Sequence, residues 1–169
     1  MLDTKKFFIG IDPGISGAIT CVDSSGNIVN KTIMPVIKIG TKNKLDPHSI
    51  IKWIKEITST GTIQIVAIEA QHAMHKQGVT STFSTGRGYG ILEGVVAGLG
   101  LPYELIRAVD WQKVMFQGYP KGQTKLLSMR IAQQLYPQEN FKKSERCVNI
   151  HDGLTDATLI AEYIRRKIK

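Results

Sequence analysis

A single acidic residue interrupts an apolar stretch near the start of the chain. Residues 7–11 read FFIGI, Asp12 follows them, and Pro13-Gly14 turns the chain before a second apolar run leaves the turn. A carboxylate at the end of a buried strand is costly unless a partner offsets its charge. The usual partners are a cationic side chain, a metal ion or an ion that also holds a phosphate. The rest of the chain should therefore supply a partner for Asp12.

Length and composition predict one globular domain over residues 1–169. Hydrophobic residues make up 42% of the chain and charged residues 21%, which is typical of a folded protein with a sizeable core. Lysine and arginine exceed aspartate and glutamate by 22 − 14 = 8, and the sequence pI is about 9.5. This excess favours a polyanionic partner, most often nucleic acid, over a merely basic protein.

The sequence shows no sign of a membrane or secretory segment. No apolar run reaches about 18 residues, and a strand-like run begins too soon after Met1 to leave room for a signal peptide. Cys21 and Cys147 form no spaced motif and are interpreted as reduced thiols. These features predict a cytoplasmic protein, in a bacterial cell or an infected host cell.

Periodicity and turn signals predict an α/β fold. Two strands within residues 7–22 and a third at 28–34 should form an antiparallel meander. The β-branched run 63–68, which ends in Glu69, is typical of a strand buried on both faces. The remaining expected elements are helices at 47–58, 80–98, 124–135 and 151–168, a strand at 101–106, a helical turn at 109–116 and a charged loop at 137–146. Residues 36–45, which carry lysines and a glycine, should form a mobile connection. The apolar residues expected to face inward are Leu126, Leu127, Ile131 and Leu135 in the helix at 124–135, and Leu154, Ala157, Ile160, Ala161 and Ile164 in the last helix. This order predicts a mixed five-stranded sheet with helices on both faces.

Four acidic residues should meet at one edge of that sheet. Asp12 and Glu69 end two strands, while Asp152 and Asp156 lie four residues apart on one face of the last helix. Converging carboxylates repel one another, and oxygen ligands suit Mg²⁺ or Mn²⁺ rather than zinc. Two such ions about 4 Å apart can activate water and stabilise the leaving oxygen of a phosphodiester. Taken singly, these acids could instead be a turn residue, a solvated strand end and a helix N-cap.

The helix expected at 80–98 is rich in glycine. Each glycine costs up to about 1 kcal/mol in a helix interior, so a group of them needs a reason. The reason could be close packing within the fold or across a dimer interface; a partly irregular segment is the alternative. The glycines are Gly86, Gly88, Gly90, Gly94 and Gly98.

These motifs resemble those of the RuvC-type Holliday junction resolvases, which have the RNase H-like (retroviral integrase) fold. The resemblance spans residues 7–164. It would also fit a phage or viral member of the family. Its most specific motifs are GIDPG at 10–14, IVAIEA at 65–70 and DGLTDATLIA at 152–161, supported by GRGYGILEG at 86–94 and KGQTK at 121–125. It implies a homodimer with two Mg²⁺ ions per active site. Such a dimer would nick opposed strands of a four-way junction in DNA recombination and repair.

The resemblance also assigns roles to individual residues. Asp12, Glu69 and Asp156 match the first, second and fourth metal ligands of the family. The third ligand often stands three residues before the fourth, where this chain has Gly153. Asp152 is therefore the expected third ligand, and His151 is the reserve because imidazole can bind metal or assist proton transfer.

Several basic or aromatic residues are expected near DNA. His72 stands where many family members carry a wedge-forming aromatic residue, and histidine can still stack on a base. Phe83 is expected to pack in the core. Arg87 either contacts phosphate or forms a salt bridge with Glu93 or an acid across an interface. The expected DNA contacts are His72, His75, Lys76, Arg87, Lys121 and Lys125; for the two histidines an ordinary exposed loop is the alternative.

The sequence therefore predicts an Mg²⁺-dependent endodeoxyribonuclease that resolves junctions by paired symmetric nicks and leaves 5′-phosphate ends. The closest alternative is a generic RNase H-like nuclease that acts on flaps, branched DNA or RNA/DNA hybrids. A non-catalytic junction-binding module would lack some of the acids. An actin-like ATPase fragment, which also opens with a strand–Asp–x–Gly hairpin, would need a second half and phosphate-binding loops.

Overall fold

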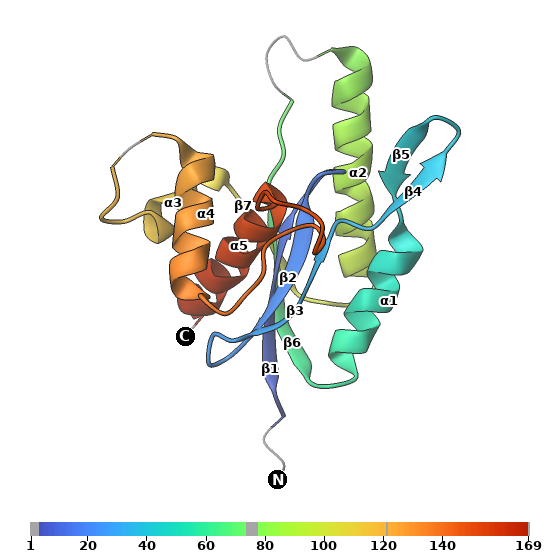
Figure 1. The fold of residues 1–169 in the computed structure, drawn as a ribbon. Coiled ribbons are helices and arrows are strands. Elements are labelled where there is room, and N and C mark those ends of the chain that lie inside the picture. Colours follow the sequence, from blue (N-terminus) through green and yellow to red (C-terminus); the bar gives the residue numbers. More distant parts are fainter. Residues whose placement is uncertain (1–3, 74–77, 121, 169) are drawn as a thin grey trace.

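A five-stranded mixed sheet forms the centre of the computed structural model, which describes residues 4–73, 78–120 and 122–168 (Figure 1). The strand order is β3-β2-β1-β6-β7. β1 pairs antiparallel with β2 and β2 with β3, whereas β1 and β6, and β6 and β7, pair in parallel. This confirms the predicted meander with two parallel strands. The bounds are β1 Lys6–Asp12, β2 Ala18–Asp23, β3 Ile28–Ile33, β6 Thr62–Glu69 and β7 Tyr103–Ile106.

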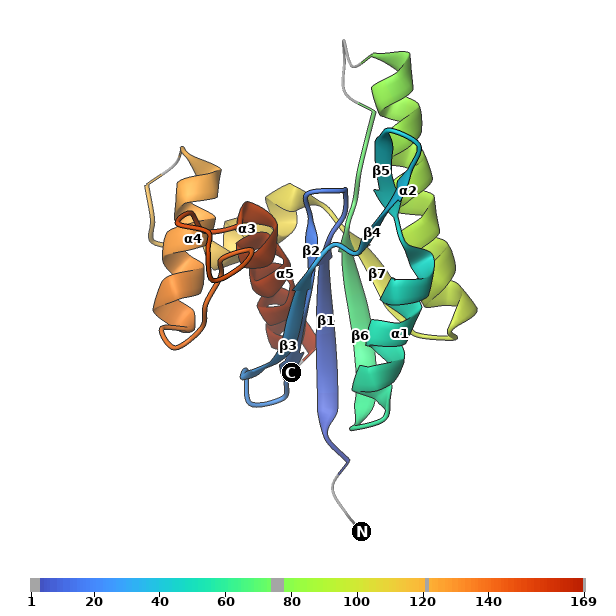
Figure 2. The same cartoon turned by 45° about the vertical axis from the view of Figure 1, so that its right-hand side comes forward.

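Helices cover both faces of this sheet (Figures 1 and 2). The helices α1 and α2 pack on one face, and α3, α4 and α5 on the other. Strand β1 contributes to both cores because its side chains alternate: Phe7, Ile9 and Ile11 join the cluster under α1 and α2, and Phe8 joins the other. The bounds are α1 Pro47–Thr58, α2 Val79–Gly98, α3 Ala108–Met115, α4 Thr124–Leu135 and α5 Asp152–Ile168.

Helix α5 lies directly against β1 because Gly10 leaves no side chain between them. A Cβ atom at Gly10 would lie 2.3 Å from both the carbonyl oxygen of Ala157 and the backbone nitrogen of Ala161. The buried face of α5 includes Ile160 and Ile164, as the periodicity predicted. This close contact fixes the position of α5 over the sheet, and with it the acids that α5 carries.

Residues 36–45 form a β-hairpin rather than the predicted mobile connection. β4 (Val36–Ile39) and β5 (Lys42–Leu45) pair antiparallel around Gly40, whose φ of +62° lies in the left-handed region that glycine adopts readily. The lysines and glycine of this segment are typical of a loop, but the β-branched residues of β4 favour a strand. In Figures 1 and 2 the hairpin stands beside the upper part of α2.

Two other predictions about packing are wrong. Leu126 and Leu135, expected to point inward from the helix at 124–135, are exposed, and α4 instead buries Ser128, Ile131 and Ala132. Phe83, expected in the core, has 71% of its surface exposed. In both cases the side that meets the sheet is set by the tertiary contacts of the helix, which hydrophobicity alone did not reveal.

Among the described residues, no helix is both long and apolar enough to cross a membrane. The thiols of Cys21, which is buried, and Cys147, which is half-buried, are free.

Candidate active site

The carboxyl ends of β1 and β6 place two acids side by side. Ile11 pairs with Ile68 in the parallel register, so Asp12 and Glu69 are the next residues on adjacent strands. After Asp12 the chain turns through Gly14, whose φ of +119° disfavours other residues. These positions confirm that the first strand and the strand at 63–68 are neighbours, as the sequence predicted.

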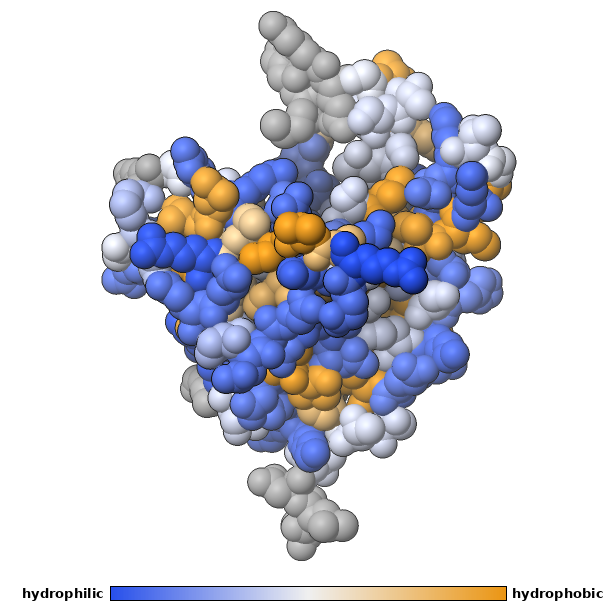
Figure 3. All heavy atoms as spheres, in the orientation of Figure 1, coloured by the Kyte–Doolittle hydropathy of each residue, from blue (hydrophilic) through white to orange (hydrophobic). Residues whose placement is uncertain are grey.

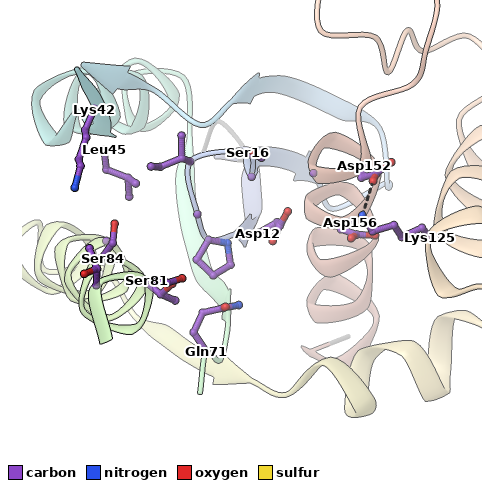
Figure 4. A pocket seen from close by; sticks show the side chains of 18 residues that line it. Asp12, Ser16, Lys42, Leu45, Gln71, Ser81, Ser84, Lys125, Asp152 and Asp156 are labelled. Carbon is purple, nitrogen blue, oxygen red and sulfur yellow. Dashed lines mark ion pairs between the residues drawn. The ribbon is translucent and has the colours of Figure 1, made fainter. Parts of the chain in front are cut away.

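The start of α5 brings the other two acids to the same place. Asp12, Asp152 and Asp156 line an open pocket of about 810 Å³ between this helix and α2. In Figure 4, Asp12 lies near the middle of the pocket, with Asp152 and Asp156 to one side of it. Glu69 is not a lining residue, although its charge acts on both Asp12 and Asp156.

Asp12 is strongly perturbed by its surroundings. Burial, followed by the charges of Asp156, Glu69 and Asp152, raises the pKa of Asp12 from 3.8 to about 8, while Lys125 acts in the opposite direction. Three of the four largest causes are other carboxylates, which shows that the acids share one electrostatic environment. A positive group in the pocket would therefore favour the ionised form of Asp12.

Asp156 has an oxygen without a partner. Burial raises the pKa of Asp156 to about 6, and Glu69 and Asp152 add to the shift, while a hydrogen bond from the Ser128 hydroxyl lowers it. Within the described residues, the buried Oδ1 of Asp156 accepts no hydrogen bond. A buried acceptor left unpaired costs about 1–3 kcal/mol, so this atom is suited to receive a ligand.

Glu69 accepts a hydrogen bond from a tryptophan of α3. The indole Nε1–H of Trp111 donates to Glu69 Oε1 at 2.9 Å, and Gln71 Nε2 lies 3.5 Å from Oε2. Burial raises the pKa of Glu69, and the Trp111 hydrogen bond partly offsets that rise. Trp111 is 1% exposed and packs edge-on against Phe116 at 5.5 Å, so the donor has a fixed position.

The backbone explains why the third acid stands at position 152. A Cβ atom at Gly153 would lie 2.7 Å from the Ser16 carbonyl oxygen and 2.8 Å from the Gly17 carbonyl carbon. No side chain fits there, because the turn after Asp12 crosses α5 at this point. The acid one residue earlier lies at the pocket rim, where Asp152 Oδ2 is 3.1 Å from Lys125 Nζ. Asp152 also raises the pKa of Lys125.

His151 caps α5 and does not line the pocket. Its Nδ1 accepts from the Leu154 backbone N–H at 3.3 Å, and its own backbone N–H donates to the Phe141 carbonyl at 2.8 Å. Burial, with the nearby charge of Lys143, lowers the pKa of His151. The pocket lining thus includes Asp152 and not the reserve ligand His151.

The residues expected to contact DNA are spread around the site. His72 is exposed beyond β6, and Arg87 is exposed on α2, where it lines a smaller adjoining cavity. In the described part of the chain Arg87 forms no ion pair, with Glu93 or any other acid. Lys125 lies at the pocket, whereas His75, Lys76 and Lys121 lie outside the described residues.

The four acids offer only oxygen donors to a possible divalent cation. Among the described residues, no three His, Cys, Asp or Glu side chains are grouped closely enough to hold a metal ion as they stand. The chemistry of the donors nevertheless fits a hard cation: all four acids offer oxygen, Asp12 is half-buried among like charges, and Asp156 Oδ1 has no partner among the described residues. A shared ion would require rotation of carboxylate side chains, for which the exposed Asp152 has room.

Sequence reasoning missed three residues that serve the acids. Trp111 and Ser128 hold Glu69 and Asp156, and Lys42 of β5 lines the pocket opposite Lys125 (Figure 4). No motif marks them, because each is brought to the site by an element whose packing the sequence did not specify.

Three solved structures resemble this fold. RuvC of Thermus thermophilus in complex with a Holliday junction substrate has a TM-score of 0.60 and 14% identity, over 96% of each chain. A second T. thermophilus RuvC structure has a TM-score of 0.54 and 15% identity, over 95% of this chain and 96% of that one. The yeast mitochondrial Holliday junction resolvase Ydc2 has a TM-score of 0.52 and 17% identity, over 94% of this chain and 77% of that one. No family model and no curated protein matches the sequence.

The chain therefore has the RNase H-like fold of RuvC-type resolvases. This confirms the fold class that the sequence predicted, with its mixed five-stranded sheet. The resemblance that the sequence motifs indicated is thus supported independently by the shape of the whole chain.

Proposed function

We propose that this protein is a structure-selective DNA endonuclease that resolves four-way junctions by metal-dependent phosphodiester hydrolysis. The observation that carries the proposal is that Asp12, Asp152 and Asp156 line one open pocket of an RNase H-like sheet, with the charge of Glu69 acting on Asp12 and Asp156. The similar structures add support, because one is RuvC with a Holliday junction substrate and another is a mitochondrial Holliday junction resolvase.

The four acids are proposed to hold two Mg²⁺ ions, for which Mn²⁺ can substitute. When bound, such ions activate water and stabilise the leaving 3′-oxygen, which leaves a 5′-phosphate. Residues of the chain position the ligands: Asp156 offers Oδ1, which has no partner among the described residues, and Trp111 orients Glu69 through a hydrogen bond. The raised pKa of Asp12 means that a cation must compete with a proton there.

Two lysines flank the acids and suit a phosphate backbone. Lys42 on β5 and Lys125 on α4 lie on opposite sides of the pocket, with Asp12 between them (Figure 4). A strand that crosses the acids would thus meet a cation before and after the site of cleavage. Such contacts position DNA without reading its sequence.

We propose a homodimer in which α2 packs against a second copy. Four of its glycines recur every four residues and so lie along one side of the helix: Gly86, Gly90, Gly94 and Gly98. Apart from their chain neighbours and the nearby backbone of α2 itself, no described atom lies within 4 Å of where their Cβ atoms would stand. Packing within the described chain therefore does not account for them, in contrast to Gly88, which faces Leu45 at 3.4 Å. A dimer would supply the two active sites that paired nicks need.

The function can be tested with a synthetic four-way junction, a linear duplex of the same sequence and an RNA/DNA hybrid. Each is incubated with Mg²⁺, Mn²⁺ or chelator, and the strands are mapped. We expect paired symmetric nicks in the junction alone, lost with chelator and with Asp12→Asn but kept with Glu56→Gln on the exposed side of α1. Equal cutting of the duplex would contradict junction selectivity, and preferential cutting of the hybrid would favour a generic RNase H-like nuclease.

A further inference from the structure

A small notch opens beside the acidic pocket, between the β4–β5 hairpin and the first turns of α2. Its volume is about 210 Å³, below the range of about 300–1,000 Å³ of small-molecule sites, so it suits a single planar group. The notch and the acidic pocket share six lining residues, among them Ile15, Lys42 and Ser84. A molecule that occupies the acidic pocket can therefore extend into the notch without leaving the protein surface.

The notch has an apolar wall and an exposed aromatic ring. Leu45 forms part of the wall and packs on α2 at Gly88, where a Cβ atom would lie 3.4 Å from Leu45 Cδ1. Phe83, one helical turn before Arg87, stands at the notch with 71% of its surface exposed. The close contact at Gly88 anchors the hairpin, so the ring faces a cavity with a defined floor.

The rim of the notch is cationic. Lys42, Lys44 and Arg87 line it, and the described lining residues include no acid. None of the three cations forms an ion pair with a described residue, whereas Lys31 and Lys167 do. Figure 3 shows hydrophobic and hydrophilic side chains intermixed where the hairpin lies in Figure 1. The positive charge of the three cations at the rim is complementary to a polyanion.

We propose that the notch receives one unpaired base of the DNA strand that crosses the acids. The ring of Phe83 stacks on that base, while Lys44 and Arg87 contact the adjacent phosphates. An exposed aromatic ring within a cationic groove is the combination by which proteins hold single-stranded DNA without a strong sequence preference. The inference rests on the proposed nuclease function, because the same strand would occupy both cavities.

The test uses the full-length protein in chelator, so that binding is measured without cleavage. One probe is a single-stranded oligonucleotide with 2-aminopurine, whose fluorescence falls on stacking; the other is a four-way junction with 2-aminopurine at the exchange point. Both probes should be quenched by the wild type. We expect Phe83→Ala to abolish the quenching and to weaken binding about 5- to 150-fold, and Phe83→Trp to retain both. Lys44→Ala and Arg87→Ala should weaken binding and preserve the quenching at saturation.

The same hairpin provides matched controls. Ile39 and Lys38 are exposed on β4 and do not line the notch, so Ile39→Ala and Lys38→Ala should leave quenching unchanged. Thermal melts of every variant establish that it is folded. Unchanged quenching and affinity in folded Phe83→Ala would overturn the proposal. So would a shift of Phe83→Ala from dimer to monomer without any effect on the oligonucleotide, since that would place the ring at an interface between copies.

The outcome is separable from that of the nuclease proposal. Quenching that depends on Phe83, in a protein that never cuts junctions, would support the notch and contradict the enzyme. Symmetric cutting by the wild type, with no effect of Phe83→Ala on binding or quenching, would support the enzyme and contradict the notch.

Discussion

Asp12 is the residue whose charge the fold tolerates least. It is half-buried at the end of β1, and desolvation together with the carboxylates of Asp156, Glu69 and Asp152 disfavours its ionised form. In the absence of a cation, the folded protein therefore favours the protonated form over a wide range of pH. The protonation of Asp12 should therefore affect the free energy of unfolding of the protein as well as its proposed activity.

We expect the stability of the metal-free protein to fall between pH 5 and pH 8. The pKa of Asp12 rises from 3.8 to about 8 on folding, so its contribution to stability is fully present below the unfolded value and is lost as pH rises toward the folded one. Asp12→Asn cannot ionise, and its melting temperature should depend less on pH. Added Mg²⁺ at pH 8 should raise the melting temperature of the wild type more than that of the variant. Parallel pH profiles of the two proteins in chelator would contradict this interpretation.

Substitution of Trp111 tests whether the proposed metal ligand Glu69 depends on its hydrogen bond from the indole N–H. Trp111→Phe keeps a ring in the buried cluster but removes the hydrogen bond to Glu69 Oε1. Loss of such an outer contact typically costs 10- to 100-fold in metal affinity or activity, and we expect the Mg²⁺ dependence of junction cutting to shift by that factor.

A matched control for Trp111 lies on the other face of the sheet. Trp53 of α1 is buried with its Nε1–H unpaired among the described residues, so Trp53→Phe should neither destabilise the protein nor change its Mg²⁺ dependence. If Trp111→Phe and Trp53→Phe gave the same Mg²⁺ titration as the wild type, Trp111 would have no role in positioning Glu69.

At the level of single residues, the sequence predicted the acids better than their surroundings. Asp12 and Glu69 could be placed together because strand order and parallel pairing follow from the pattern of elements. The choice of Asp152 over position 153 rested on resemblance, and its physical cause is the backbone contact between Gly153 and the turn at Ser16. Contacts of this kind depend on how a helix docks on a sheet, which hydrophobic periodicity does not determine.

Among the elements, the β4–β5 hairpin differs most from what the sequence suggested. The bounds of α2 were predicted closely. Its glycines were expected to pack closely within the fold or across a dimer interface, and packing within the described chain accounts for Gly88 but not for the other four. The hairpin was missed because its strands are only four residues long and its lysines are typical of loops. α2 and the hairpin form the side of the site away from α5. That side carries the open glycines and the notch around Phe83.

Substitutions at the open glycines should separate folding from association. Gly90→Ala and Gly90→Leu place side chains where the single chain has space, and both residues favour helix by roughly 0.5–1 kcal/mol over glycine. The monomer should therefore keep or gain stability. In a dimer packed along α2, overpacking of about 1–3 kcal/mol would raise the dissociation constant about 5- to 150-fold for leucine, and less for alanine.

Sedimentation over a range of concentrations measures this change. Lys52→Leu, on the exposed side of α1, adds a similar side chain elsewhere and should leave the dissociation constant unchanged. Gly90→Leu with wild-type association would show that this side of α2 is not an interface.

Across the whole molecule, the acids and the cations occupy different places. The chain carries a net charge of +8, yet Asp12, Asp152 and Asp156 converge on one pocket, and several lysines line this pocket or the adjoining notch. Some of the basic residues are already paired: Lys31 with Glu139, and both Arg165 and Arg166 with Glu162. Each ion pair between one cation and one acid cancels within itself and leaves the net charge of +8 unchanged, so the unpaired cations around the two cavities set the positive field there.

The salt dependence of junction binding should reveal which lysines contact phosphate. For binding in chelator, each lysine that neutralises a phosphate contributes about 1 to the slope of log K against log salt concentration. Lys42 forms no ion pair with a described residue, so Lys42→Ala should reduce the slope by about 1. Lys125→Ala should reduce it by less, because Asp152 already holds the Lys125 ammonium at 3.1 Å. Lys55→Ala, in the last turn of α1 and remote from both cavities, should leave the slope unchanged. Equal slopes for Lys42→Ala and Lys55→Ala would mean that DNA does not follow the hairpin side of the pocket.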